Sequence, residues 1–168
     1  MKINIKRNHK DAVIPEFAHS TDTGFDLFTC EDLELLPYQK GIAKTGLIFE
    51  LPKGYGFQVR NKSGMTVKGV PCTVVIEGLD RITLESKISY YQERIDITVY
   101  LGTIDEGYTG EVGIMVKNET NKKIIIPKHT KLAQGVLEKV YQCEFVEVEN
   151  IKETDRGDKG YGSSGTSK

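Results

Sequence analysis

The stretch Glu111-Val-Gly-Ile-Met-Val-Lys117 alternates apolar and polar residues, as a strand with one buried and one exposed face does. A polar turn segment follows at 118–123, and the apolar run Ile124-Ile-Ile126 then ends at Pro127. Proline has no backbone N–H to give to a sheet, so it marks the end of this second strand. The strand–turn–strand pattern predicts a β protein.

Short apolar runs separated by turn residues continue on both sides of this stretch. They predict further strands at Gly41–Leu51, Tyr55–Val59, Leu132–Val140 and Glu144–Val148. Between the first two, Pro52-Lys-Gly54 supplies a turn. Many short strands at regular spacing predict an all-β fold, a jelly-roll-like β-barrel or sandwich.

No long stretch combines apolar residues at helical spacing with caps at both ends. The one helix that the sequence favours is short and covers Ser63-Gly-Met-Thr-Val-Lys68. Ser63 is its expected N-cap, since a hydroxyl accepts a hydrogen bond from a free backbone N–H, and Gly69 is its expected terminator.

Composition and charge restrict the class of protein. With 168 residues, 38% of them hydrophobic and 28% charged, the chain fits one globular domain. It has 23 Lys and Arg against 24 Asp and Glu, a net charge of −1, and so lacks the surplus of cations needed to bind nucleic acid by bulk charge. No apolar run reaches membrane-spanning length, and Met1–Arg7 has no apolar signal core. A cytoplasmic enzyme or binding module is expected.

The three cysteines, Cys30, Cys72 and Cys143, are odd in number and have no CxxC spacing. Disulfide frameworks and zinc sites use paired cysteines at characteristic spacings. We therefore expect three reduced thiols in the core.

Residues 73–96 differ from the predicted barrel strands. In this segment Ile82 and Leu84, then Ile88 and Tyr90, alternate with polar neighbours. Period-two alternation favours a hairpin arm over the alternative, a short amphipathic helix.

The tail at 150–168 is polar and rich in glycine and serine. It has too little apolar surface to offset the entropy of ordering, so we expect it to be mobile until it binds a ligand. The chain is thus expected to consist of a β domain, residues 1–149, and a flexible C-terminal lid, residues 150–168.

The lid carries groups suited to a phosphorylated ligand. Arg156 is a permanent planar cation for phosphate oxygens, and the Gly162-Ser-Ser164 segment adds backbone and hydroxyl donors. Tyr161 is an aromatic platform on which a base stacks. Taken alone, a Gly- and Ser-rich terminus is more often simply disordered.

Asp105 and Tyr108 share a glycine-bounded loop, Gly102–Gly110. A carboxylate in such a loop can orient and deprotonate a water molecule, which is general-base chemistry. On spacing alone, the simpler interpretation is a hairpin turn between two strands.

Three further segments place polar groups on or beside predicted strands. Lys62, Ser63 and Gly64 stand at the start of the predicted helix, where they form either an anion site or a solvated loop. Gln134 interrupts an apolar strand, most simply to make a structural hydrogen bond. Asp26 lies between two apolar strand residues, a costly position unless the carboxylate is paired or serves a cation.

Together, and in this order, these segments resemble the five motifs of the trimeric dUTPase family. The resemblance covers nearly the whole chain, and its third and fifth motifs are specific. The segments are Asp-Thr-Gly-Phe-Asp-Leu (22–27), Asn-Lys-Ser-Gly-Met (61–65), Gly-Thr-Ile-Asp-Glu-Gly-Tyr (102–108), Lys-Leu-Ala-Gln (131–134) and Arg-Gly-Asp-Lys-Gly-Tyr-Gly-Ser-Ser-Gly (156–165).

The resemblance implies a jelly-roll-like homotrimer with shared active sites, which hydrolyses dUTP to dUMP and diphosphate with Mg²⁺. Asp105 would activate the water that attacks the α-phosphate, and Tyr108 would pack on the deoxyribose and leave no room for a 2′-hydroxyl. Asp26 would act on Mg²⁺ through coordinated water. Tyr161 would stack on uracil. The groups implied to hold phosphate oxygens are Lys62, Ser63, Gly64, Gln134, Arg156, Gly162, Ser163 and Ser164.

The chain departs from the family pattern in several places. Lys62 and Lys131 stand where Arg is usual, which keeps the charge but loses the bidentate geometry. Tyr161 stands where Phe is commoner and still stacks. No Asn precedes Asp105 within 97–102, so reading of uracil falls to main-chain groups near Val99.

The arm at 73–96 is the largest departure. From Ser63 to Asp105 is 105 − 63 = 42 positions, longer than the compact hairpin of family members and similar to phage and bacterial members with insertions. Two alternatives to dUTP hydrolysis stay open. One is a dCTP deaminase-like enzyme of the same superfamily; the other is a nucleotide-sensing regulator that binds a protein partner through the arm. Arg156 and the pairing of Asp105 with Tyr108 favour hydrolysis.

Overall fold

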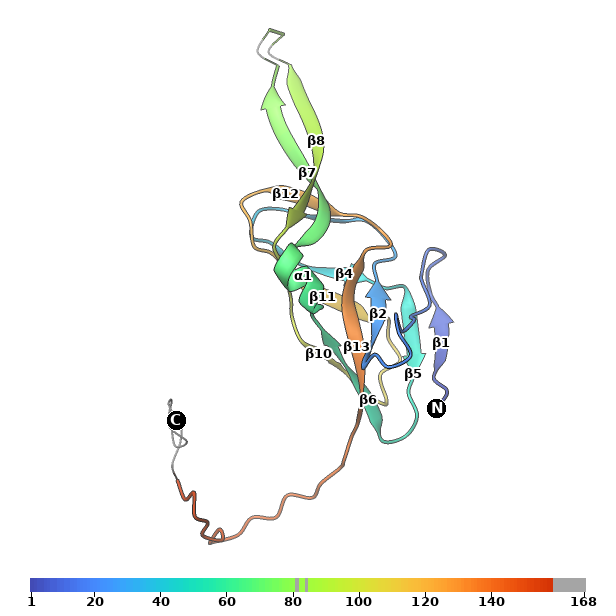
Figure 1. Ribbon diagram of the computed structural model, residues 1–168, viewed down its shortest axis with the longest axis vertical. Coiled ribbons are helices and arrows are strands. Elements are labelled where there is room, and N and C mark those ends of the chain that lie inside the picture. The colour runs from blue at the N-terminus through green and yellow to red at the C-terminus, as the bar shows by residue number, and fades with distance from the viewer. Residues whose placement is uncertain (81, 84, 159–168) are drawn as a thin grey trace.

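The computed structural model describes residues 1–80, 82–83 and 85–158, and Figure 1 shows their path. The described elements are thirteen strands and one helix. In chain order they are β1 (Asn4–Arg7), β2 (Gly24–Phe28), β3 (Leu33–Leu35), β4 (Lys40–Lys44), β5 (Leu47–Glu50), β6 (Tyr55–Arg60), α1 (Ser63–Lys68), β7 (Val70–Leu79), β8 (Ser86–Ile95), β9 (Ile97–Val99), β10 (Gly102–Ile104), β11 (Gly113–Asn118), β12 (Lys123–Ile126) and β13 (Lys131–Lys139).

These strands pair into four antiparallel sheets, in the orders β10-β6-β13-β2, β3-β12-β7-β8, β4-β11-β9 and β1-β5. The predicted all-β fold with one short helix is confirmed. β11 and β12 lie on either side of the predicted polar turn but enter different sheets, so this turn carries the chain from one layer to another.

Asn118 holds that turn in place. Its side chain is fully buried, and its amide donates to the backbone oxygens of Leu36 and Lys122 at 3.0 and 2.7 Å. Its oxygen accepts from both the N–H and the hydroxyl of Thr120. A buried amide with all these partners fixes the backbone where the chain changes sheets.

The core follows the alternation read from the sequence. In β11, Ile114 and Val116 are fully buried while Met115 between them is 42% exposed. The rings of Phe25 and Phe57 meet edge to face at 5.3 Å. Truncating a fully buried ring such as Phe57 typically costs about 3–5 kcal/mol, so these aromatics are a principal source of stability.

One predicted strand, Gly41–Leu51, is divided into β4 and β5. The break lies at Gly46, whose φ of +67° is easily adopted only by glycine. A side chain there would also approach Cβ of His9 to 2.7 Å and Cβ of Ala12 to 2.9 Å. The alternation of apolar residues continues across the break, which is why the sequence pattern did not reveal it.

The helix has the predicted bounds, but its N-cap prediction was wrong. Lys62, not Ser63, occupies the N-cap position in an extended conformation, and no side chain caps the helix. Gly69 ends α1 as predicted, with a φ of +73°. Within the described residues, no helix is long and apolar enough to cross a lipid bilayer.

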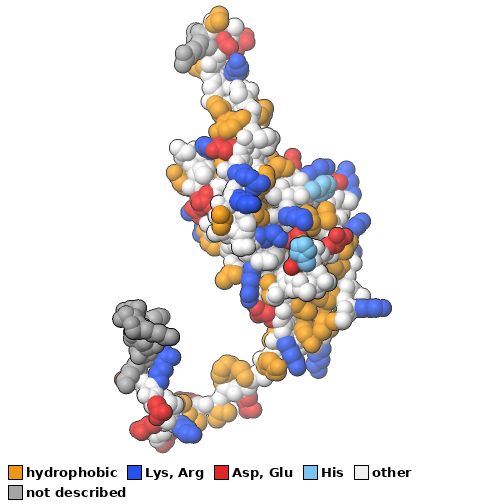
Figure 2. All heavy atoms as spheres, viewed as in Figure 1, with side chains coloured by type: hydrophobic (Ala, Val, Ile, Leu, Met, Phe, Trp, Pro, Cys, Tyr) orange, Lys and Arg blue, Asp and Glu red, His pale blue; other side chains and the backbone are white. Residues whose placement is uncertain are grey.

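The predicted hairpin arm is confirmed. β7 and β8 pair over ten positions and project from the barrel as a two-stranded ribbon (Figure 1). The root of the arm is buried, through Val70, Cys72 and Val74, whereas the outer part is exposed. Figure 2 shows hydrophobic side chains at the surface of this outer part.

Beyond β13 the predicted strand at Glu144–Val148 is not formed. The segment leaves the barrel without a neighbouring strand, and Phe145 is 93% exposed (Figure 1). Strand-forming residues make a strand only when another strand offers its backbone groups. Cys143 lies in this segment and is exposed, so the prediction of three core thiols holds only for Cys30 and Cys72. Burial raises the pKa of Cys72 to about 12.

Candidate active site

A buried carboxylate between two lysines forms the first part of the site. Asp26 on β2 is 4% exposed. Lys62, just before α1, pairs with its Oδ1, and Lys131 at the start of β13 places Nζ 2.9 Å from its Oδ2. The sequence indicated that a carboxylate here needs a partner, and the structure supplies two.

The two lysines keep this carboxylate ionised. Burial of Asp26 opposes ionisation, but the hydrogen bonds and charges of Lys62 and Lys131 outweigh it and hold the pKa of Asp26 below its usual value. One negative and two positive groups therefore meet here, and the cluster attracts anions.

Gln134 fixes the loop that carries Lys62. Its Cα is paired with those of Asp26 on β2 and Arg60 on β6, and its Nε2 donates to the backbone oxygen of Asn61 at 3.0 Å. This is the structural hydrogen bond expected from the sequence alone. Neighbouring Gly24 leaves room for it, because a side chain there would come within 2.7 Å of Gln134 Oε1.

Ser63 and Gly64 are exposed at the start of α1, directly after Lys62. A Cβ added at Gly64 would meet no atom within 4 Å. The backbone of this loop is therefore open to a ligand.

The second part of the site is a cleft of about 340 Å³ at the end of β10. Asp105 and Tyr108 both line it, as their shared loop predicted, together with Thr103 and Glu111. Tyr108 N donates to the Asp105 backbone oxygen at 3.1 Å, so the loop is also the tight turn that spacing suggested. The volume suits a small-molecule ligand.

Gly110 sets the position of the Tyr108 ring, which the sequence did not reveal. The Tyr108 hydroxyl donates to the Glu111 backbone oxygen at 2.9 Å, which lays the ring back over the loop. A Cβ at Gly110 would stand 2.5 Å from this hydroxyl oxygen and 2.6 Å from the ring carbon that bears it. Only glycine permits this ring position.

Changing Gly110 to alanine should therefore displace Tyr108 and relax any discrimination that the ring makes between sugars. The family resemblance implies that this ring packs on deoxyribose, so we expect the ratio of kcat/KM for dUTP to that for UTP to fall on the order of 10-fold, the size of one altered packing contact. The matched control is Gly107→Ala in the same loop, where an added Cβ meets nothing within 4 Å. An unchanged ratio in Gly110→Ala would show that Tyr108 does not select the sugar.

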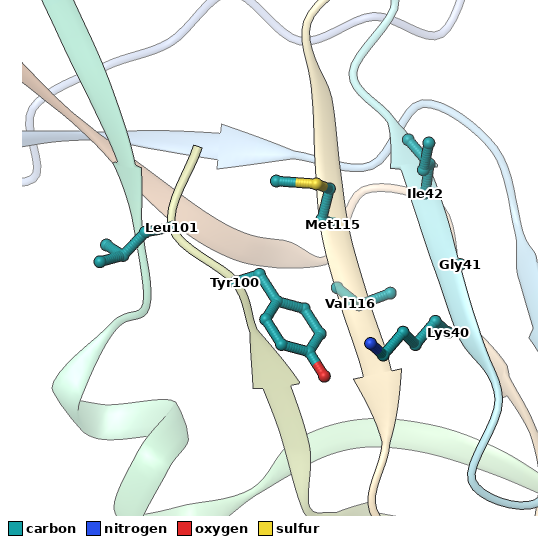
Figure 3. Close-up of a pocket in the computed structure, with 7 residues that line it drawn as sticks. All are labelled: Lys40, Gly41, Ile42, Tyr100, Leu101, Met115 and Val116. Atoms are coloured by element: carbon teal, nitrogen blue, oxygen red, sulfur yellow. The ribbon is translucent and has the colours of Figure 1, made fainter. Parts of the chain in front are cut away.

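A second hollow of about 490 Å³ adjoins the cleft and shares Ile42 and Met115 with it. Figure 3 shows Lys40 and Tyr100 pointing toward one another across it, and the lysine Nζ lies 5.1 Å from the ring centre. Its wall is largely apolar and exposed, with Ile42 at 61% and Leu101 at 70%. This surface was not predicted, because it gathers residues from β4, β11 and the β9–β10 bend.

Val99 lies beside this hollow but offers only its backbone. Its side chain is 7% exposed, and its Cα pairs with that of Val116 on β11. The next N–H, of Tyr100, donates to the Met115 backbone oxygen at 2.9 Å.

The two parts of the site lie at opposite ends of β6. Ile104 pairs with Phe57 near one end, while Lys62 follows the other end. Lys62 lies five positions after Phe57 along the chain. An extended chain of that length spans about 17 Å, at about 3.3 Å per residue. Within one chain, Asp105 and the lysine cluster therefore do not face a common small region.

The C-terminal segment also leads away from both parts. β13 ends beside Tyr55, where Val140 and Gln142 line a pocket together with Asp105. Residues 143–158 then run outward from the barrel (Figure 1). Arg156 is exposed on this segment. The other predicted lid residues, Tyr161, Gly162, Ser163 and Ser164, lie outside the described residues.

The described ranges contain no ready-made cluster of metal ligands. Across residues 1–80, 82–83 and 85–158, no group of three or more His, Cys, Asp or Glu side chains converges to hold an ion. Asp26, the predicted acid, has both oxygens paired with lysines.

Comparison with known proteins connects this geometry to a family. A sequence model of the dUTPase family matches residues 86–165. The deoxyuridine 5′-triphosphate nucleotidohydrolase of Helicobacter pylori strain P12 is 32% identical over 168 residues, covering 100% of this chain and 99% of that protein. The enzyme of the same name from Clostridioides difficile is 31% identical over 163 residues, covering 97% of each.

Among solved structures, the Staphylococcus bacteriophage 80alpha dUTPase G164S mutant with dUpNHpp has a TM-score of 0.76 and 26% identity, and the alignment covers 98% of each chain. The jelly-roll-like fold is thereby confirmed. The whole-length identity, the family match and the shared fold show that this chain belongs to the dUTPase family and that it is phage-like.

Proposed function

We propose that this protein hydrolyses dUTP to dUMP and diphosphate, by attack of water on the α-phosphate. The observation that carries the proposal is the cleft at the end of β10 that Asp105 and Tyr108 both line. The relatives named deoxyuridine 5′-triphosphate nucleotidohydrolase, aligned over the full chain, support the same reaction.

In this reaction Asp105 is the general base. Its carboxylate orients the attacking water and accepts a proton from it as the oxygen–phosphorus bond forms. The electron pair of the breaking bond leaves with diphosphate. Tyr108, fixed over Gly110, packs on the deoxyribose and excludes a 2′-hydroxyl by lack of space.

Lys62, Ser63 and Gly64 bind the phosphate groups. Their loop is exposed and carries positive charge, and it is held by Gln134 through Asn61. Gln134 then serves the phosphates chiefly by positioning this loop. Arg156 and the Gly162–Ser164 segment would close over the γ-phosphate, with Tyr161 stacked on uracil.

Mg²⁺ is proposed to arrive with the triphosphate. The acidic side chains of the described residues do not form a cluster that could hold the ion without other ligands. They fit an ion whose main ligands are phosphate oxygens and water. Bound there, Mg²⁺ would neutralise charge on the phosphates. Asp26 would reach it through coordinated water.

Uracil is proposed to be read by main-chain groups from Val99 to Gly102. The Val99 side chain is buried. The bend that follows it, Tyr100 and Leu101, lines the apolar hollow that adjoins the Asp105 cleft. Backbone N–H and C=O groups at fixed positions match the donor and acceptor edge of uracil.

We further propose a homotrimer in which different chains complete each site. About 17 Å of β6 separates the Asp105 end from the lysine end, and the tail leaves its own barrel (Figure 1). The exposed apolar hollow around Ile42 and Leu101 is a suitable contact between copies. Sedimentation of the full chain should give three times the monomer mass; a monomer that hydrolyses dUTP at full rate would contradict shared sites.

The reaction is tested by incubating the protein and Mg²⁺ with dUTP, dCTP, dTTP and UTP in turn and identifying the products. We expect dUMP and diphosphate from dUTP and little conversion of the others. Formation of dUTP from dCTP would favour the deaminase alternative. Absence of dUMP would reject the proposed reaction.

A second candidate function, binding of a protein partner by the arm, is favoured by one observation. Leu79, Ile88 and Tyr90 share one face of the β7–β8 ribbon and are 64%, 55% and 62% exposed. Exposed apolar stripes of this kind mark interaction surfaces.

A chain with a shortened arm tests whether the outer part of the arm is needed for folding. Replacing residues 77–88 by Asn-Gly joins Ile76 to its cross-strand partner Ser89 through a two-residue turn. The buried root stays intact, so we expect the melting temperature to change by less than about 4 °C, or about 1 kcal/mol, and dUTP hydrolysis to persist. Calorimetry and the product assay check both; aggregation of the shortened chain would make the arm structural.

A further inference from the structure

Each carboxylate oxygen of Asp26 is already paired with a lysine. Lys62 holds Oδ1, and Lys131 holds Oδ2 at 2.9 Å. The residue is 4% exposed, so solvent hardly competes for it. Each carboxylate oxygen has a second lone pair, but the group is buried beneath both lysines. The water shell of a metal ion therefore reaches it only when at least one lysine moves away.

The lysines are placed so that they can move. The side chain of Lys131 is 55% exposed and that of Lys62 is 27% exposed, so both ammonium groups border solvent. A lysine ammonium is a point charge on a rotatable stem, whereas an arginine would form a rigid planar fork with the carboxylate.

The backbone on either side of the lysines is fixed. Gln134 donates a hydrogen bond to the backbone oxygen of Asn61. The backbone N–H of Lys62 in turn donates to Asn61 Oδ1 at 2.9 Å. Lys131 is held by the β13–β2 pairing opposite Phe28, and its Nζ lies 5.5 Å from the Phe28 ring centre. Only the side-chain ends need to turn.

We propose that Lys62, Asp26 and Lys131 form an exchangeable charge lock that couples Mg²⁺ to nucleotide binding. In the free protein Asp26 neutralises part of the lysine charge and is closed to metal. When a triphosphate binds, its oxygens take over the lysine ammonium groups, and the released carboxylate oxygens accept hydrogen bonds from the water shell of Mg²⁺. The inference rests on the proposed function and explains why lysines, with their rotatable charges, serve at both positions.

The lock has a definite consequence for affinity. Without Mg²⁺, Asp26 competes with phosphate for the lysines and repels it, so the carboxylate weakens nucleotide binding. With Mg²⁺, the same carboxylate contributes to binding. Asp26 thus has opposite effects in the two conditions.

The experiment measures binding of the imido analogue dUpNHpp by calorimetry, in EDTA and in magnesium chloride, to the full chain and to Asp26→Asn. In EDTA we expect Asp26→Asn to bind on the order of 5-fold tighter, the size of one solvent-accessible ion pair. The gain in affinity on adding Mg²⁺ should shrink by about 10-fold or more, as when an outer-shell metal partner is lost. Glu93→Gln, which removes a lysine-paired carboxylate at the arm root, is the control and should match the unaltered chain.

Equal weakening of dUpNHpp binding by Asp26→Asn in both conditions would overturn the lock and make Asp26 a fixed structural brace. An unchanged affinity in both conditions would overturn it as well. Failure of the unaltered chain to bind dUpNHpp at all is a different result, because it would reject the proposed function itself.

Lys131→Met keeps the test decisive if Asp26→Asn does not fold. This change leaves Oδ2 of Asp26 without its lysine, so the gain in dUpNHpp affinity on adding Mg²⁺ should be larger than in the unaltered chain by on the order of 5-fold. Lys128→Met removes an exposed partner of Asp11, 3.6 Å away, and is the matched control. A Lys131→Met protein whose gain equals that of the unaltered chain would show that Lys131 does not close the carboxylate.

Discussion

Replacing Asp105 with asparagine should lower kcat for dUTP by about 100- to 10,000-fold, the usual contribution of a general base. An amide keeps the size and hydrogen-bonding reach of the carboxylate but cannot accept the proton from the attacking water. The affinity for dUpNHpp should stay close to that of the unaltered protein, because Asp105 contacts the water and not the phosphates. Steady-state kinetics and calorimetry with dUpNHpp check the two halves of this prediction.

The adjacent acid supplies a matched control. Glu106 accepts a hydrogen bond from Gly54 N at 2.6 Å and thus has a structural partner of its own. Glu106→Gln should retain most of the activity. If Asp105→Asn hydrolysed dUTP at the normal rate, or if Glu106→Gln were the inactive variant, the assignment of the base to Asp105 would be wrong.

Deleting residues 156–168 should lower kcat/KM for dUTP by about 100-fold or more, since the deletion removes several charge-assisted donors from the transition state. The barrel should remain folded, because residues 143–158 are exposed and run outward from it (Figure 1). Assembly should be unaffected, and sedimentation of the truncated chain measures this directly.

Arg156→Ala separates the guanidinium from the remainder of the tail. If this single change reproduces most of the loss, Arg156 is the main phosphate clamp. A truncated chain with normal kcat/KM would contradict the lid.

The sequence predicted the barrel strands where local pattern and final environment agree. The alternation at Ile114, Met115 and Val116 is directly the alternation of buried and exposed faces in β11. The helix limits were also correct, because Gly69 adopts a φ that other residues avoid. These features depend on neighbouring residues only.

Sequence reasoning was wrong where the local structure depends on residues far along the chain or on a neighbouring strand that is missing. Glu144–Val148 has the residues of a strand but no neighbouring strand among the described residues, and Cys143 just before it is exposed as well. The effect of Gly110 on Tyr108 is also invisible in sequence, because it depends on a ring folded back over the loop.

For the candidate site, the sequence indicated individual residues but not which of them lie together. A carboxylate at Asp26 required a counter-charge, but its partners lie far along the chain, at Lys62 and Lys131. Spacing along one strand cannot identify charges that three separate segments bring together. Lys131 therefore entered the prediction only as a departure from a motif.

The length of β6 has a consequence for cells that contain two versions of this protein. Because Asp105 and the lysine cluster stand at opposite ends of that strand, one chain defective at Asp105 and another defective at Lys62 would carry damage at different corners of an assembly. In the proposed homotrimer, mixed assemblies would contain some sites built entirely from intact parts, so two inactive alleles would complement each other.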